Sequence, residues 1–164
     1  MKKMVDYGYI ERTHGLKGRL IIRLFVLGPA VPLEAGTVLV AGDRKLTVTR
    51  SRKRDNQRIT LDCSELRSVE EADALRGASV SVAESSVLRD GFPVPVYSFE
   101  GFTICSGEKS YSIRKVEFNS SNPQLIVQGE DSSFPVPVNM AMSGEINMEK
   151  RTITLQLPEG MEEL

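Results

Sequence analysis

The sequence predicts a mainly β protein made of two small β-barrels, the first with six strands and one short helix. Short apolar runs that alternate with polar residues recur along the chain, separated by turns rich in Gly, Asn, Ser and Asp. One segment, residues 68–77, changes to helical spacing. A length of 164 residues, 40% of them hydrophobic, is enough for one ordinary domain or two small ones.

The first barrel is expected to contain one helix among its strands. Ser68 and Glu71 have the spacing of a capping box at the start of this helix, and Gly77 stands where its C-cap would fall. Several short strands around a single helix favour a small antiparallel barrel. The expected strands are residues 7–11, 19–27, 37–40, 45–52, 58–63 and 78–83.

Composition changes along the chain and suggests a domain boundary. Residues 1–88 hold 15 Lys and Arg against 11 Asp and Glu, whereas residues 89–164 hold 6 against 11. Prolines and glycines gather where the charge changes sign, so we expect a first domain at 1–88, a linker at 89–100 and a second domain at 101–164. The strands expected there are 102–105, 111–118, 124–128, 133–138 and 152–157, followed by an appendage, PEGMEEL.

Several classes of protein are excluded by what the sequence lacks. No run of about 18 apolar residues could span a membrane, and the N-terminus lacks the apolar centre of a secretory signal. A cytoplasmic protein without membrane attachment is therefore expected. Cys63 and Cys105 have no Cys or His at metal-ligand spacing, so we expect no metal, disulfide or cofactor. Nothing demands more than a monomer.

The segment HGLKG, residues 14–18, contains the only histidine and lies between two expected strands. Its glycines are too close together for a Walker loop, and its neighbours are strands, whereas a KH loop joins helices. An enzyme using His14 would need a positioned partner group, which the sequence does not show. The simplest interpretation is a tight turn, held by a His14 ring hydrogen bond, with Lys17 and Arg19 adding contacts to phosphate.

The densest cationic run is RSRKR, residues 50–54, with Arg58 shortly after it. Cations on a loop can bind phosphates without reading bases, and no aromatic residue lies among them to stack on a base. An RNA contact and a solvated turn both remain open for this run. The residues expected to contact RNA are His14, Lys17, Arg19, Arg50, Arg52, Lys53, Arg54 and Arg58.

Taken together, these motifs resemble the N-terminal domain of the RimM family of ribosome maturation factors. The matching elements, in chain order, are Gly8-Tyr9-Ile10, the HGLKG segment with Gly15 and Gly18, and EADALRG, which ends in Leu75-Arg76-Gly77. The end of the chain, FPVPV and then MEKRTITLQLPEGMEEL, is similar to the closing strands of the family's second domain. The resemblance covers nearly the whole chain.

This resemblance implies a translation-factor-like barrel, a PRC-type barrel and a function that is not enzymatic. It implies a factor that binds the immature small ribosomal subunit near its head and assists the folding and processing of 16S rRNA. It also implies cooperation with small-subunit ribosomal protein number nineteen. The alternative is a PRC-type adaptor that binds a protein and has no role on RNA.

Two positions depart from the family pattern. Arg19 stands where the family usually has an acidic residue. A tyrosine pair implicated in holding the ribosomal protein aligns, when Gly101 is matched, with Val94 and Pro95. The nearest aromatic residues are Tyr97 and Phe99, which we expect either to contact the protein partner or to pack in the core.

Overall fold

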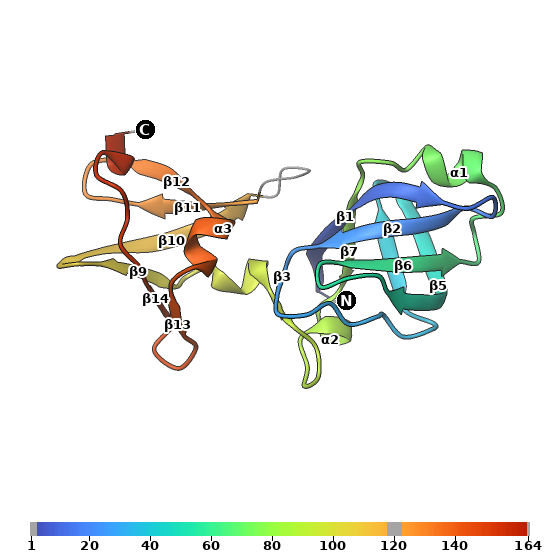
Figure 1. Ribbon diagram of the computed structural model, residues 1–164, viewed down its shortest axis with the longest axis horizontal. Helices are drawn as coiled ribbons and strands as arrows, with labels where there is room; N and C mark the ends of the chain where they lie inside the picture. The colour runs from blue at the N-terminus through green and yellow to red at the C-terminus, as the bar shows by residue number, and fades with distance from the viewer. Residues whose placement is uncertain (1–2, 118–122, 164) are drawn as a thin grey trace. The chain divides into compact units, whose positions relative to one another are not determined.

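The computed structural model describes residues 3–117 and 123–163 (Figure 1). The chain divides into two compact units, the first ending at Pro95 and the second beginning at Val96. Strands are the main element of both units, which confirms the mainly β prediction.

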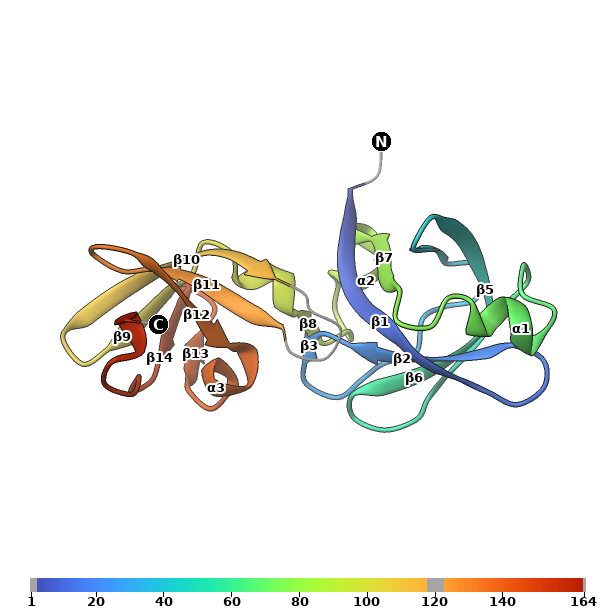
Figure 2. The same cartoon turned by 90° about the horizontal axis from the view of Figure 1, so that it is seen from above.

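As predicted, six strands close the first unit into a barrel. Their order around the barrel is β1-β2-β6-β5-β4-β7. Every ladder in it is antiparallel, and pairing of β1 with β7 completes the ring. Figure 2 shows the same strands from above. The strands are β1 (Met4–His14), β2 (Arg19–Leu24), β4 (Val38–Ala41), β5 (Arg44–Lys53), β6 (Arg58–Cys63) and β7 (Ser79–Ala83).

Alternate residues of these strands fill the barrel. In β6, Ile59 and Leu61 are completely buried, whereas the residues that alternate with them, Arg58, Thr60 and Asp62, are partly exposed. A buried side chain of this size stabilises the fold by about 1.5–3 kcal/mol. The buried apolar side chains of the other barrel strands include Ile10, Leu20, Ile22, Leu39, Leu46, Val48, Val80 and Val82.

Gly8 lets β1 approach β2 closely. A Cβ atom at this position would lie 2.2 Å from the carbonyl oxygen of Arg23, so a larger residue would push the two strands apart. The register of β1 also shifts between Asp6 and Gly8 against β7, and between Ile10 and Arg12 against β2. Such irregularities bend a strand, which suits one that pairs along both of its edges in a closed barrel.

The predicted strand 19–27 is interrupted at Phe25. This ring is buried, and the Phe25 amide donates to the carbonyl oxygen of Tyr7 at 2.9 Å. The chain then resumes as β3 (Val26–Leu27), which pairs with β8 (Val94–Pro95). A two-residue strand is too short to show periodicity, so the sequence could not predict β8.

The predicted helix is α1 (Val69–Asp73), and its predicted cap is present. The Glu71 amide donates to the Ser68 hydroxyl oxygen at 3.2 Å, and the following turns end at Gly77, which has a φ of 84°. The first unit also contains α2 (Glu84–Val87), which the sequence did not predict.

The second unit is built on a six-stranded sheet in the order β12-β11-β10-β9-β14-β13. The β9–β14 ladder is parallel and the other ladders are antiparallel. Its strands are β9 (Thr103–Ser106), β10 (Lys109–Glu117), β11 (Gln124–Gln128), β12 (Ser133–Pro137), β13 (Glu145–Asn147) and β14 (Thr152–Thr154). The three-residue β13 was not predicted, and Phe118, the expected end of strand 111–118, lies outside the described residues.

Three short helical elements complete the second unit. They are η1 (Val96–Phe99), α3 (Val138–Met142) and η2 (Met161–Glu163). Met161 is buried and the Glu162 carboxylate accepts hydrogen bonds from Lys109 and Tyr111, so the described part of the PEGMEEL segment, residues 158–163, packs against the sheet. The expectation that this segment is an appendage is therefore wrong.

Candidate nucleic-acid interface

The HGLKG segment forms the tight connection between β1 and β2. His14 and Arg19 pair at the end of the hairpin, and Gly15 and Gly18 have φ values of 78° and 81°. A Cβ atom on Gly18 would lie 2.6 Å from the carbonyl oxygen of Ser68, the cap residue of α1. Glycine therefore allows this loop to lie directly against the start of the helix, as can be followed in Figure 2.

The second motif, Leu75-Arg76-Gly77, returns the chain from α1 to β1. The Gly77 amide donates to the Ile10 carbonyl oxygen at 2.8 Å, and the Ile10 amide donates to the Ala78 carbonyl oxygen at 2.9 Å. Leu75 is buried, whereas the Arg76 side chain is exposed. The two motifs thus fasten α1 to the β1–β2 hairpin from either side.

His14 and its neighbours are exposed. Within the described part of the chain the His14 ring makes no hydrogen bond, so the expected bond across the loop is absent. Leu16, at the tip of the loop, is 89% exposed. Beside it lies an open hollow of about 610 Å³, whose lining includes Lys17 and Asp62.

Two of the arginines expected to contact RNA are held by carboxylates. Arg19 donates to both oxygens of Asp62, at 2.9 and 3.3 Å. Arg58 donates to Glu11 from Nε at 2.9 Å and to Asp55 from Nη1 at 3.1 Å. The hydrogen bond with Asp62 raises the pKa of Arg19, and the one with Glu11 raises the pKa of Arg58. Their charges are therefore partly compensated within the protein.

The cationic run contrasts with this pair. Arg50, Arg52, Lys53 and Arg54 are all exposed at the end of β5 and the start of the turn into β6. Among the residues that the structure describes, none of the four has a carboxylate partner. This run therefore presents unneutralised positive charge to solvent.

Two further arginines belong to the same part of the barrel and were missed in the sequence. Arg23 lies directly opposite Arg58 on β6, and Arg12 lies on β1 opposite Ile21. Each stands apart from the cationic run in the sequence, so no local charge cluster marks it. Period-two alternation with the buried Ile22 could have placed Arg23 on the outer face of the barrel. Alternation alone would have put Arg12 on the inner face with Ile10, because the register shift between these two residues is not visible in the sequence.

The structure assigns one of the two candidate aromatics of the second unit to the core. Phe99 is completely buried and packs edge to face against Phe102, with ring centres 5.0 Å apart, so its ring is not accessible to a partner. Tyr97 is half-buried in η1. Val94 and Pro95, at the place of the family's tyrosine pair, form β8. Gly101 has a φ of 89°, which explains the need for glycine there.

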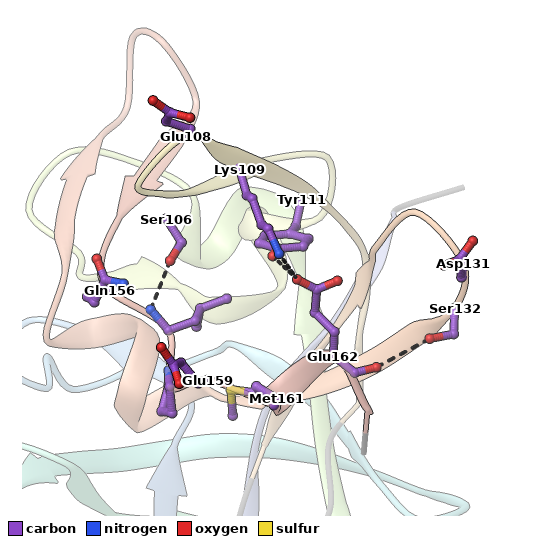
Figure 3. Close-up of a pocket in the computed structure, with 13 residues that line it drawn as sticks. Ser106, Glu108, Lys109, Tyr111, Asp131, Ser132, Gln156, Glu159, Met161 and Glu162 are labelled. Atoms are coloured by element: carbon purple, nitrogen blue, oxygen red, sulfur yellow. Dashed lines mark hydrogen bonds and ion pairs between the residues drawn. The ribbon is translucent and has the colours of Figure 1, made fainter.

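An open hollow of about 760 Å³ lies beside the C-terminal segment of the second unit. Figure 3 shows Lys109 and Tyr111 pointing toward the carboxylate of Glu162. The Lys109 Nζ lies 3.1 Å from this carboxylate, and the Tyr111 hydroxyl also donates to it. The hydrogen bond from Tyr111, followed by that from Lys109, lowers the pKa of Glu162. Glu108, Asp131 and Glu159 also line the hollow, which is acidic overall.

Across residues 3–117 and 123–163 no three His, Cys, Asp or Glu side chains are grouped so that they could hold a metal ion. None of the helices in these ranges has the length and apolar character needed to cross a membrane. The fold and the charges define a two-unit β protein with a cationic barrel and an acid-rich second unit.

Comparison with known proteins identifies the family. The sequence profile described as the RimM N-terminal domain matches residues 5–87, which is just over half of the chain. The chain therefore belongs to the RimM family, and the resemblance seen in its motifs is confirmed.

Curated relatives extend the match over nearly the whole chain. The ribosome maturation factor RimM of Lactobacillus delbrueckii subsp. bulgaricus is 25% identical, over 95% of this chain and 97% of its own. The ribosome maturation factor RimM of Syntrophobacter fumaroxidans is 26% identical, over 96% of this chain and 93% of its own. A solved structure from Pseudomonas aeruginosa is described as a candidate 16S ribosomal RNA processing protein RimM. Its sequence is 16% identical to this chain, and the TM-score of the two structures is 0.41. The match covers 95% of this chain and 98% of the Pseudomonas chain.

Proposed function

We propose that this protein is a non-enzymatic maturation factor that binds the immature small ribosomal subunit near its head and assists the folding of 16S rRNA. The family match supports the biological setting. The observation that carries the RNA contact is the run Arg50, Arg52, Lys53 and Arg54, exposed and without carboxylate partners in the described chain. Such cations bind phosphates and release counterions.

The proposed mechanism is stabilisation by binding. A factor shifts an equilibrium between two rRNA arrangements only by the difference in its affinity for them. A tenfold preference for the mature arrangement corresponds to about 1.4 kcal/mol in its favour. Contacts to the backbone suit this task, because they respond to the path of the RNA strand more than to its sequence.

The second unit is proposed to contact small-subunit ribosomal protein number nineteen. Residues 89–164 carry an excess of acidic side chains, which suits a basic protein partner. Tyr97 is the proposed aromatic contact, because tyrosine provides a large contact area and a hydroxyl group. Phe99 is buried in the core and is not part of this contact.

Binding to ribosomal particles tests this function. Purified protein is incubated with immature small subunits, mature small subunits, large subunits and assembled ribosomes at two salt concentrations. We expect retention on immature small subunits, weaker at the higher salt concentration because the contact is electrostatic. A folded protein that binds none of these particles would contradict the proposal and favour an adaptor that binds only a protein.

The cationic run is tested by replacing Arg52, Lys53 and Arg54 with Ala. We expect weaker RNA binding, and the slope of log affinity against log salt should fall by about 0.7 to 0.9 for each phosphate that the variant no longer neutralises. The control replaces Lys45, Arg67 and Arg76, three exposed cations elsewhere in the first unit, and removes the same charge. Equal behaviour of the two triple variants would remove the run from the RNA surface.

A further inference from the structure

The register of the barrel strands places several arginines on one outer face. Arg50 of β5 is opposite Asp62 of β6, and this carboxylate binds Arg19 of β2. Residues directly opposite each other in a ladder point to the same side of a sheet. The side chains of Ile59 and Leu61, which alternate with this set on β6, fill the barrel, so Arg50 and Arg19 point outward.

The same face continues along the strands toward the β5–β6 turn. One row of directly paired residues crosses all four strands. In the order β5, β6, β2 and β1, its members are Arg52, Thr60, Ile21 and Arg12. Further along, Arg58 of β6 is opposite Arg23 of β2. We call the resulting set the arginine face; its members are Arg12, Arg19, Arg23, Arg50, Arg52 and Arg58.

Positive charge on the arginine face exceeds the acidic charge beside it. Glu11 holds Arg58, and Asp62 holds Arg19. Across the described residues the other four arginines of the face have no carboxylate partner. Four adjacent strands thus carry like charges that repel one another, and a bound polyanion would relieve this repulsion.

Strand geometry sets the spacing of these charges. Outward positions on one strand are about 7 Å apart and neighbouring strands about 5 Å apart. Guanidinium groups pair with phosphate through two parallel hydrogen bonds, which lysine cannot do. Tyr9, opposite Arg23, is buried and offers no exposed ring to a base. The face thus fits a phosphate backbone rather than unstacked bases.

We propose that the arginine face binds the sugar-phosphate backbone of 16S rRNA, with Arg12 and Arg23 as binding residues. This inference rests on the proposed function and extends it from the turn after β5 to the outer surface of four strands. The pairs with Asp62 and Glu11 hold Arg19 and Arg58 in place, and the other arginines are free to contact phosphates.

The test is a double variant, Arg12→Gln with Arg23→Gln, in the full-length protein. Binding to a 16S rRNA transcript is measured by fluorescence anisotropy over a series of KCl concentrations. We expect about tenfold weaker binding at moderate salt and a salt slope that is smaller by about 1.4 to 1.8, since two phosphates are no longer neutralised. The matched control, Lys45→Gln with Arg76→Gln, removes the same charge from outside the face and should bind as the wild type does.

A charge-preserving variant separates charge from geometry. Arg12→Lys with Arg23→Lys should keep the salt slope but bind with lower affinity than the wild type, because lysine cannot form the paired hydrogen bonds. If the glutamine variant fails to fold, this lysine variant still tests whether Arg12 and Arg23 bind phosphates. Its binding with full wild-type affinity would overturn the assignment of Arg12 and Arg23 as bidentate phosphate ligands.

The remaining outcomes distinguish the inference from the function on which it rests. A wild-type protein that binds neither the transcript nor immature small subunits would overturn both. If the wild type binds and the two glutamine variants behave alike, the arginine face is excluded while the proposed function stands.

Discussion

Gly15 and Gly18 have nearly the same backbone conformation but different surroundings. With φ values of 78° and 81°, both lie in the left-handed region, which costs a residue with a side chain about 1–2 kcal/mol. A Cβ atom at Gly15 would meet nothing within 4 Å, whereas at Gly18 it would lie 2.6 Å from the Ser68 carbonyl oxygen. Gly15 therefore serves the turn alone, and Gly18 also serves the contact with α1.

Replacing each glycine with alanine separates these two roles. Gly18→Ala should lower the free energy of unfolding by about 2–4 kcal/mol, because conformational strain adds to a backbone clash. Gly15→Ala carries the strain alone and should cost about 1–2 kcal/mol. Urea unfolding followed by circular dichroism measures both. Equal destabilisation by the two variants would mean that the loop does not depend on its contact with the helix.

At the scale of elements, Glu65 links the segment after β6 to strand β5. Its carboxylate accepts hydrogen bonds from the Thr47 amide at 2.7 Å and the Thr47 hydroxyl at 2.9 Å. The Ser64 hydroxyl donates to the same group at 3.1 Å. The hydrogen bond from the Thr47 amide is the main cause that lowers the pKa of Glu65.

This link should make barrel stability depend on pH. A carboxyl whose pKa is lowered by folding stabilises the protein above its unfolded pKa, and that stabilisation is lost as the pH falls through the folded pKa. Glu65→Gln should therefore reduce stability near neutral pH and flatten the decline below about pH 4.3, the ordinary glutamate pKa. Unfolding in urea at a series of pH values measures this.

The control for Glu65 is Asp43→Asn, in the exposed turn between β4 and β5. It removes an acidic charge without removing a hydrogen bond to the β5 backbone. The role given to Glu65 would be refuted if its variant and the control were destabilised to the same extent at every pH.

At the scale of the whole molecule, the two units differ in charge and each has its own core. Apolar side chains such as Leu20 and Ile59 fill the barrel, and others such as Ile104 and Phe134 fill the second unit. The β3–β8 ladder lies entirely within the first unit. A division after Pro95 would therefore leave the pairings of each unit complete.

We predict that residues 1–95 and 96–164 fold as separate fragments. Each buries its own apolar side chains, which is what independent folding requires. The first fragment should retain RNA binding with its salt dependence, and the second should show none, because the cationic run and the arginine face both lie in the first. Circular dichroism and RNA binding of both fragments are the measurements. Fragments that fold only when mixed would contradict independent units.

The local elements of the fold could be predicted because their signals are local. Alternation marks β6, and Ser68 with Glu71 marks the start of α1, since each depends on residues within a few positions. The break at Phe25 and the strand β8 could not be predicted in this way. They arise from pairing between segments far apart in the chain, at Val26 with Pro95.

In the candidate site, too, some features could be predicted from the sequence and others depend on the tertiary structure. From sequence alone the cationic residues and the family motifs were evident, since residue type and spacing carry that information. Only the tertiary structure showed that Arg19 and Arg58 bind carboxylates, that Phe99 is buried, and that the register brings Arg12 beside the others. Charge is a property of a single residue, whereas its neutralisation, exposure and neighbours depend on which distant strands pair, and in which register.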